Sequence, residues 1–103
     1  MMAGGFKPPQ DATEEVQQVL DSVKGDLAAH LPDGTDTNSV TAMAFSTQVV
    51  AGVIYLIKAR CGEESGPVIH VKIIKPLPHT NQPPGIMAVA HEGINAQSDL
   101  IPI

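Results

Sequence analysis

The sequence predicts an α+β protein in which one helix packs across a sheet of antiparallel strands. The first observation is a stretch near the N-terminus with apolar residues at spacings of three and four. The second is a series of β-branched runs after it, separated by short segments rich in glycine, proline and polar residues. Such short connections join antiparallel neighbours, so the helix must cover one face of their sheet. With 103 residues, we expect positions 1–103 to form one domain.

The first ten residues are predicted to form a flexible arm. This segment contains Gly4, Gly5, Pro8 and Pro9. Prolines favour extended backbone over helix, and glycine adds conformational freedom. We therefore expect residues 1–10 to contain at most a short edge strand.

A single long helix is predicted from Asp11 or Thr13 to Leu31. Either of the first two residues can cap the helix, and Glu14 and Glu15 in its first turn oppose the positive end of the helix dipole. The proline and glycine that follow should end it after roughly five turns. The apolar stripe consists of Val16, Val19, Leu20, Val23, Leu27 and Leu31.

Four strands are expected after the helix. Their ranges are Val40–Val49, Val53–Arg60, Pro67–Lys75 and, more weakly, Gly85–Ala96. The third has the cleanest period of two, with His70 and Lys72 alternating with apolar residues. This alternation puts His70 on a polar face, where we expect it to be solvated. In the first strand, strict alternation places Met43, Phe45 and Thr47 on one face.

Charge and hydropathy exclude two classes of partner. The chain carries a net charge of −5, and its six Lys and Arg residues are scattered. Nucleic-acid binding needs basic residues that neutralise phosphates, so no nucleic acid is expected. The longest apolar run, Val49–Ile57, is far shorter than the roughly 20 residues that cross a bilayer, so no membrane is expected either.

Cys61 is the only cysteine, so the chain can form no internal disulfide. This suits a reducing compartment, and the N-terminus lacks the pattern of a secretory signal. We expect a cytoplasmic protein, although secretion of a mature chain remains open. A catalytic thiol would need a histidine base, and no histidine spacing pairs with Cys61. A structural thiol is expected, with no metal and no cofactor, and a small thiol enzyme is the most remote of the functional interpretations.

The segment Gln48-Val49-Val50-Ala51-Gly52 is predicted to be an apolar hairpin tip. Hairpin tips are usually polar, because they face solvent. Apolar residues on an exposed loop are typical of a surface that binds a partner. The other interpretation is ordinary strand continuation with a plain turn.

Together with Gly4 upstream and Leu77-Pro78-His79 downstream, this tip resembles the stefins, or type 1 cystatins, the disulfide-free branch of the cystatin superfamily. The resemblance extends over Ala12–Gln17 and Tyr55–Lys58. Pro76 stands where the family usually has serine. The resemblance implies a cystatin-like fold, with a five-stranded antiparallel sheet wrapped around one long α-helix.

The resemblance also implies a function without catalysis. Stefins are reversible, tight-binding, non-covalent inhibitors of papain-like cysteine proteases of the cathepsin type. Their N-terminal arm and two hairpin loops enter the active-site cleft as a wedge. The protease-binding residues implied for this chain are Gly4, Gly5, Gln48, Val49, Val50, Ala51, Gly52, Leu77, Pro78 and His79.

Alternatives remain for several of these features. Ile101-Pro102-Ile103 replaces the aromatic residue that stefins carry near the C-terminus, so the alternative function is a non-inhibitory stefin-fold interaction module. Gly4 and Gly5 can also be plain terminal flexibility. The proline-rich segment 76–84 fits a turn better than an SH3 ligand. The resemblance further implies a monomer whose first hairpin can open to form a domain-swapped dimer.

Overall fold

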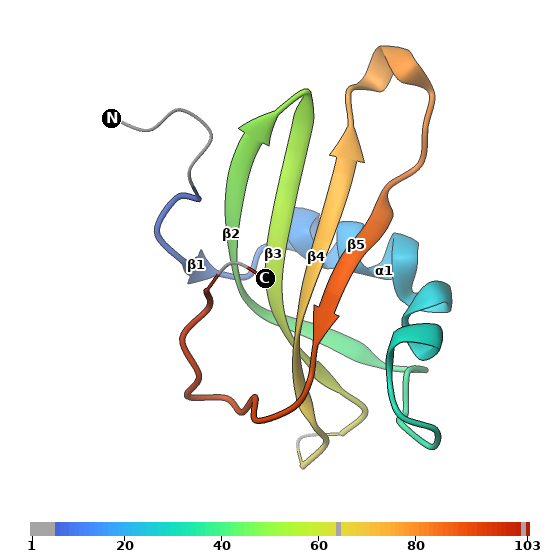
Figure 1. Ribbon diagram of the computed structural model, residues 1–103, viewed down its shortest axis with the longest axis vertical. Coiled ribbons are helices and arrows are strands. Elements are labelled where there is room, and N and C mark those ends of the chain that lie inside the picture. Colours follow the sequence, from blue (N-terminus) through green and yellow to red (C-terminus); the bar gives the residue numbers. More distant parts are fainter. Residues whose placement is uncertain (1–5, 64, 102) are drawn as a thin grey trace.

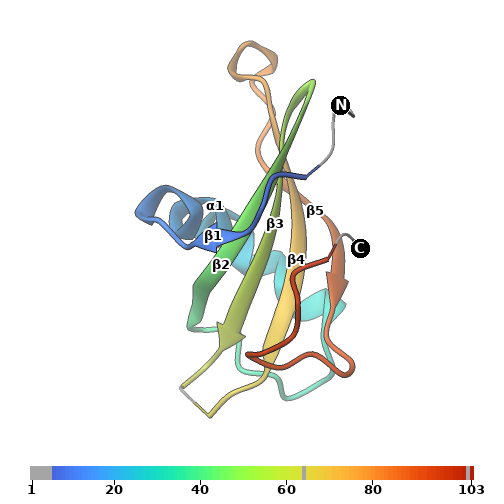
Figure 2. The ribbon, with the colours of Figure 1, turned by 90° about the vertical axis from the view of Figure 1, so that its left-hand side faces the viewer.

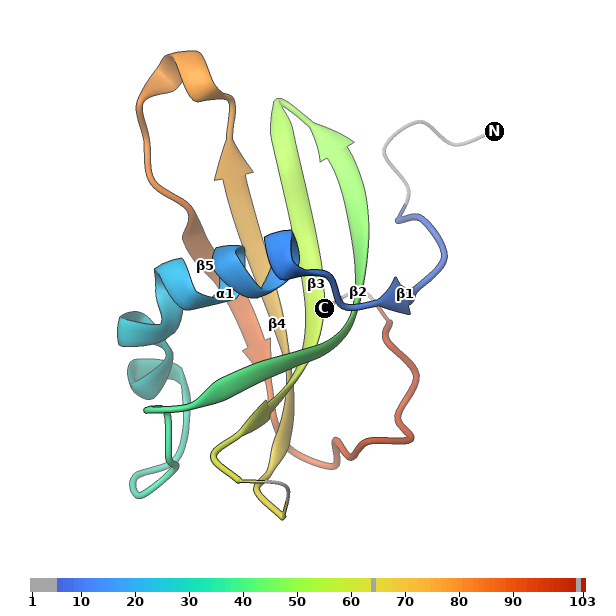
Figure 3. The same cartoon turned by 180° about the vertical axis from the view of Figure 1, so that it is seen from behind.

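The computed structural model describes residues 6–63, 65–101 and 103, and it confirms the α+β class. Five antiparallel strands form one sheet in the order β1-β2-β3-β4-β5, and helix α1 crosses one face of it (Figures 1 and 3). The strands are β1 (Gln10–Asp11), β2 (Val40–Val50), β3 (Gly52–Cys61), β4 (Val68–Pro76) and β5 (Gly85–Ala90). The helical elements are α1 (Glu14–Leu27) and the 3-10 turns η1 (Ala28–His30) and η2 (Pro78–Thr80). No helix in this described part of the chain is long and apolar enough to cross a membrane.

Helix α1 begins as predicted but ends earlier. Thr13 is the N-cap, and its hydroxyl oxygen accepts a hydrogen bond from the backbone N–H of Val16 at 3.3 Å. The prediction of one α-helix through Leu31 is wrong, because the last turn, η1, is a 3-10 helix and Leu31 is extended, with φ −125° and ψ 158°. Leu31 precedes a proline, whose ring disfavours the α conformation in the residue before it.

The core lies between α1 and the sheet face that it covers. The predicted apolar stripe of the helix is buried and packs on inward-facing residues of β3 and β4. Fully burying such an aliphatic side chain stabilises the fold by about 1.5–3 kcal/mol. The core residues are Val16, Val19, Leu20, Val23, Leu27, Leu31, Val40, Tyr55, Ile57, Ala59, Cys61, Ile69, Val71 and Ile73.

An irregularity in β2 breaks the predicted alternation of that strand. The register with β3 shifts between Ala42 and Ala44, which leaves Met43 without a paired residue. As a result Ala42 and Phe45, three positions apart, both pack against the core. The expectation that Met43 shares the face of Phe45 fails here, because one extra residue in a strand moves the following side chains to the other face.

The side chain of Gln17 spans this irregularity and ties α1 to β2. Its Nε2 donates to the carbonyl oxygen of Val40 at 2.9 Å, and its Oε1 accepts from the N–H of Ala42 at 2.8 Å. A further bond joins Nε2 to Asp21 Oδ1 at 3.0 Å. One amide thus satisfies both a donor and an acceptor where the strand ladder is interrupted.

The chain after β5 does not continue as a strand. β5 ends at Ala90, so the prediction of a strand to Ala96 is wrong. The following segment turns back across the sheet face opposite the helix (Figure 2). Two lysines of that face hold it: Lys58 Nζ donates to Ala96 O at 3.0 Å, and Lys72 Nζ donates to Ile103 O at 2.9 Å.

This covering segment also explains why the expectation for His70 is wrong. His70 does lie on the face away from the helix, as the alternation predicted, but that face is not free. The side chain is 1% exposed, and Leu56 and Ser46 on the same face are also buried. Period-two alternation identifies two faces of a strand, but it does not say whether a later segment covers the polar one.

We predict that Gln17→Leu lowers the free energy of unfolding by about 1–3 kcal/mol, because a partly buried backbone donor and acceptor lose their partner. Urea denaturation measures the change. Gln18→Ala, on an exposed position of the same helix, is the control and should be within about 0.5 kcal/mol of the parent. Equal stability of the Gln17 and Gln18 variants would contradict the bridging role.

Candidate functional site

Two loops lie together at one end of the sheet (Figure 1). The first, between β2 and β3, contains residues 48–52, and the second follows β4 and contains residues 77–81. The pairing register joins them, because Gly52 is opposite Val50 on one side and opposite Pro76 on the other. The structure therefore brings together the two predicted loop motifs, which 24 residues separate in the sequence.

The first loop is a tight and apolar hairpin tip, as predicted. β2 runs to Val50, β3 begins at Gly52, and Ala51 alone connects them. The side chains of Val49 and Val50 are 60% and 42% exposed. Gln48, by contrast, is only half-exposed and pairs with Ile54 within the ladder.

Gly52 is required by both its conformation and its surroundings. Its φ is +121°, a region that favours glycine, and its backbone is buried against β4. A Cβ atom at this position would lie 2.5 Å from the carbonyl oxygen of Lys75. The close approach of the two backbones keeps the first loop next to the start of the second.

The second loop is stiffened by prolines and by its own hydrogen bonds. Pro78 begins the single turn η2, and the backbone N–H and hydroxyl of Thr80 both donate to Leu77 O, at 3.0 and 2.7 Å. Asn81 ends the turn in the left-handed conformation, with φ 55°. Leu77 is 40% exposed, and His79 is exposed beside it.

A groove of about 200 Å³ runs between the two loops. Most of its wall is apolar, and it includes the exposed Leu77 of the second loop. Its lining residues are Gly52, Val53, Tyr55, Lys75, Pro76, Leu77 and Pro78. Sequence patterns gave no indication of this groove, because it exists only through the pairing of β3 with β4.

Tyr55 forms the floor of the groove from the core side. The residue is 6% exposed, and burial, followed by the negative charge of Glu15, raises the pKa of its hydroxyl. The phenol is therefore neutral at physiological pH. It presents an apolar ring to the groove.

The N-terminal segment approaches the same end of the molecule. Gly4 and Gly5, predicted to contact a partner, lie outside the described residues. Where the description begins, the chain follows the edge of β2: the N–H of Lys7 donates to Thr47 O at 2.9 Å, and β1 pairs Gln10 with Phe45. Thr47, which accepts the hydrogen bond from Lys7, is the residue immediately before the first loop.

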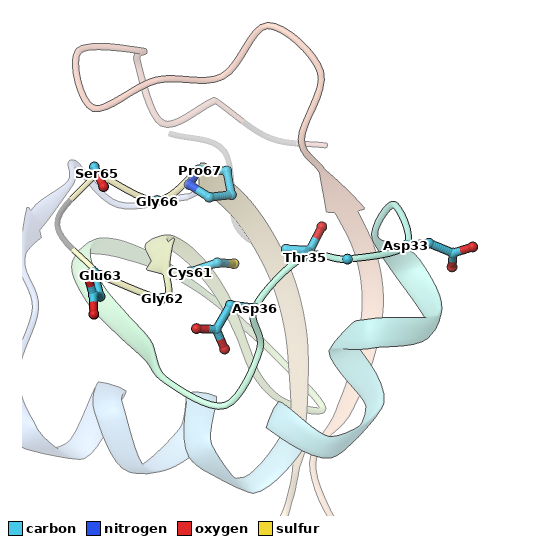
Figure 4. A pocket seen from close by; sticks show the side chains of 10 residues that line it. Asp33, Thr35, Asp36, Cys61, Gly62, Glu63, Ser65, Gly66 and Pro67 are labelled. Atoms are coloured by element: carbon cyan, nitrogen blue, oxygen red, sulfur yellow. The ribbon is translucent and has the colours of Figure 1, made fainter.

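A second hollow, of about 510 Å³, lies at another part of the molecule (Figure 4). Loop residues Asp33 and Asp36 and the β3–β4 connection line it, together with Cys61. Cys61 is fully buried, and burial, with a smaller effect of Asp36, raises the pKa of its thiol. A raised pKa disfavours the thiolate, which is the reactive form, so this cysteine is structural rather than nucleophilic.

In the part of the chain that the structure describes, no three His, Cys, Asp or Glu side chains gather as metal ligands.

Comparison with known proteins identifies the class. The family model described as the cystatin domain matches residues 4–88. Stefin-C of Bos taurus is 39% identical over 80 residues, which are 78% of this chain and 75% of the relative. Cystatin-A of Homo sapiens is 35% identical over 82 residues, 80% of each chain. A solved secreted type 1 cystatin from Fasciola hepatica, 23% identical, superimposes with a TM-score of 0.63 over 86% of this chain and 96% of that one, and supports the fold.

The chain therefore belongs to the cystatin family of cysteine protease inhibitors. The predicted resemblance to stefins and the cystatin-like fold are both confirmed. The protein is an inhibitor-family member and not an enzyme, in agreement with its buried cysteine, whose thiol has a raised pKa.

We predict that Gly52→Ala destabilises the protein by about 1–3 kcal/mol, because a Cβ at this positive φ would also collide with Lys75 O. Chemical denaturation provides the measurement. Gly85→Ala is the matched control, since Gly85 also lies in the sheet but has no atom within 4 Å of an added Cβ. A Gly52 variant as stable as the Gly85 variant would show that the close approach is not needed.

Proposed function

We propose that this protein inhibits papain-like cysteine proteases of the cathepsin type by inserting its two loops, with the N-terminal arm, into the active-site cleft. The observation that carries the proposal is the joint position of Val49, Val50 and Leu77. These are large exposed apolar side chains, and the strand pairing puts all three at one end of the sheet. Family membership supplies the class of target.

The construction of both loops favours tight, reversible binding. The ladder of β2 and β3 fixes the first loop, and Pro78 with the bonds of Thr80 fixes the second. Little conformational freedom is then lost on binding, which leaves more of the contact energy as affinity. The close turn at Ala51 carries the backbone back into the sheet, so the loop fills a cleft without lying through it as an extended substrate does.

The proposed binding residues have different roles. Val49, Val50 and Ala51 enter the centre of the cleft, with Gln48 and Gly52 supporting them from the strands. Leu77, Pro78 and His79 occupy the primed side, and the arm around Gly4 and Gly5 follows the non-primed side. The anchor at Lys7 aims the arm from beside the first loop. We expect the contribution of this arm to differ most between proteases.

Two further proposals concern where and in what form the protein acts. A single buried cysteine and the stefin resemblance fit a cytoplasmic inhibitor of cathepsin-type proteases. The protein acts as a monomer, and opening of the first hairpin would allow α1 and its adjoining strands to exchange with a second copy. Exchange straightens the hairpin and removes the first-loop wedge, so such a dimer should not inhibit.

The function is tested by titrating active papain with the purified monomer and following hydrolysis of a peptide substrate. We expect stoichiometric loss of activity, full recovery on dilution or competition, and intact inhibitor by mass spectrometry. A folded monomer that leaves papain fully active at micromolar concentration would overturn the proposal and favour the non-inhibitory interaction module.

From the proposed insertion of the first loop, we predict that Val50→Asp weakens inhibition of papain at least about a hundredfold. The reason is that a carboxylate would be buried in the protease cleft without a partner. The inhibition constant is the measurement. Ile101→Asp is the control: it also introduces aspartate at an exposed apolar position, 61% accessible, on the C-terminal segment. Its inhibition constant should be unchanged. Unaltered inhibition by the Val50 variant would contradict insertion of the first loop.

A further inference from the structure

The sheet face opposite the helix is closed by the end of the chain. We call residues 91–101 and 103 the tail. It leaves β5, turns, and passes back over this face, so that the helix and the tail lie on opposite sides of the sheet (Figure 2). Among the described residues, two hydrogen bonds from lysine side chains of the sheet hold the tail. Lys58 Nζ donates to Ala96 O, and Lys72 Nζ donates to Ile103 O.

His70 lies between these anchors. It is paired directly opposite Lys58 across β3 and β4, and Lys72 is the next residue of β4 on the same face. The imidazole is 1% exposed, and neither Nδ1 nor Nε2 has a hydrogen-bond partner among the described residues. A buried polar ring without partners is costly even when neutral, and a buried imidazolium without an acceptor costs far more.

The charged groups around His70 make protonation still less favourable. On its own face, β3 carries Lys58 and Arg60, and β4 carries Lys72. The residues of β2 and β5 nearest to it on this face (Ala44, Ser46, Ala88 and Ala90) are uncharged. Asp11 of β1 lies opposite Ala44 on the same face, but it is exposed and three strands away from His70. The two acidic side chains of the tail, Glu92 and Asp99, are exposed, and His91 at the start of the tail is half-buried. A protonated His70 would thus be a further cation in a cluster of cations.

We propose that the tail is a pH-sensitive strap, which neutral His70 allows to close over the sheet and which protonation of His70 releases. When the tail is released, water can hydrate the imidazolium of His70. The ring then no longer needs a hydrogen-bond partner within the protein. The tail is suited to this role because half of its residues are exposed. Its anchors are hydrogen bonds from lysine side chains, whose ammonium groups water can solvate once the tail has left. The hydrophobic core between helix and sheet contains no tail residue, so it can stay intact when the tail leaves.

The direction of the pH dependence follows from the same geometry. Burial, and then the charge of Lys58, lowers the pKa of His70 from its ordinary value of 6.5. The released form, with a solvated imidazole, binds the proton more strongly than the closed form. The closed form is therefore fully favoured above about pH 6.5 and loses stability as the pH falls below that value, by at most about tenfold in the opening equilibrium per pH unit.

The test is amide hydrogen exchange of the full chain, resolved by residue, between about pH 4.5 and 7.5, with each rate corrected for its intrinsic pH dependence. We expect protection of tail amides such as Ala96 to fall as the pH drops, while amides of α1 such as Leu20 and Val23 keep theirs. The imidazole signals of His70, followed in the same samples, should titrate together with the loss of tail protection.

Two variants make the assignment specific. His70→Leu is similar in size and cannot titrate, so protection of its tail should no longer depend on pH. His91→Gln removes the imidazole at the start of the tail and should retain the parent's pH dependence. If His70→Leu does not fold, the joint titration of His70 and the tail in the parent chain still decides the question.

Three results would overturn the proposal. The first is constant tail protection over the whole pH range in the parent. The second is a pH dependence that persists in the His70 variant or disappears in the His91 variant. The third is loss of protection in α1 at the same pH as in the tail, which would mean that acid unfolds the whole protein rather than releasing a strap.

Discussion

The register of β3 between its two neighbours is the constraint on which the site depends. β3 pairs with β2 from Gly52 to Cys61 on one side and with β4 from Gly52 to Arg60 on the other. Gly52 is thus paired with both neighbouring strands at the loop end of the sheet. Because Gly52 has no side chain, the backbone of β4 can approach it at Lys75. The two loops consequently end at the same level and enclose an apolar groove. A shift of one residue in either ladder would turn their side chains to the opposite face.

The two faces of the sheet are closed by different physical means. On one face, the helix buries a continuous aliphatic core, and the amide of Gln17 connects it to the irregular part of β2. On the other face, the chain end passes over the side of the sheet on which Leu56 and His70 are buried, and lysine side chains attach it. The first closure rests on hydrophobic burial, which changes little with pH. The second places a titratable ring among cations, and its strength therefore depends on protons.

The inhibitor-family assignment and the proposed wedge are supported by separate observations. Family membership comes from similarity over most of the chain, whereas the wedge comes from where Val50 and Leu77 are exposed and how their loops are held. The reactive-thiol interpretation fails on physical grounds of its own, because burial and Asp36 keep Cys61 protonated. The family is one of inhibitors rather than enzymes, and rigid apolar loops are well suited to binding by surface complementarity.

The sequence by itself determined the helix with its apolar stripe, the hairpin at Val49–Gly52 and the proline-stiffened second loop, because each is encoded by residues close together in the chain. It also determined the family, because several short motifs occur along the chain in the stefin order. Only the tertiary structure decided features that depend on distant segments. The break in alternation at Met43 comes from pairing with β3, and the groove under Leu77 comes from pairing between β3 and β4. The burial of His70 has the same origin: its local pattern indicates a polar face, but a segment more than twenty residues later covers that face. Local periodicity carries no information about such a distant contact.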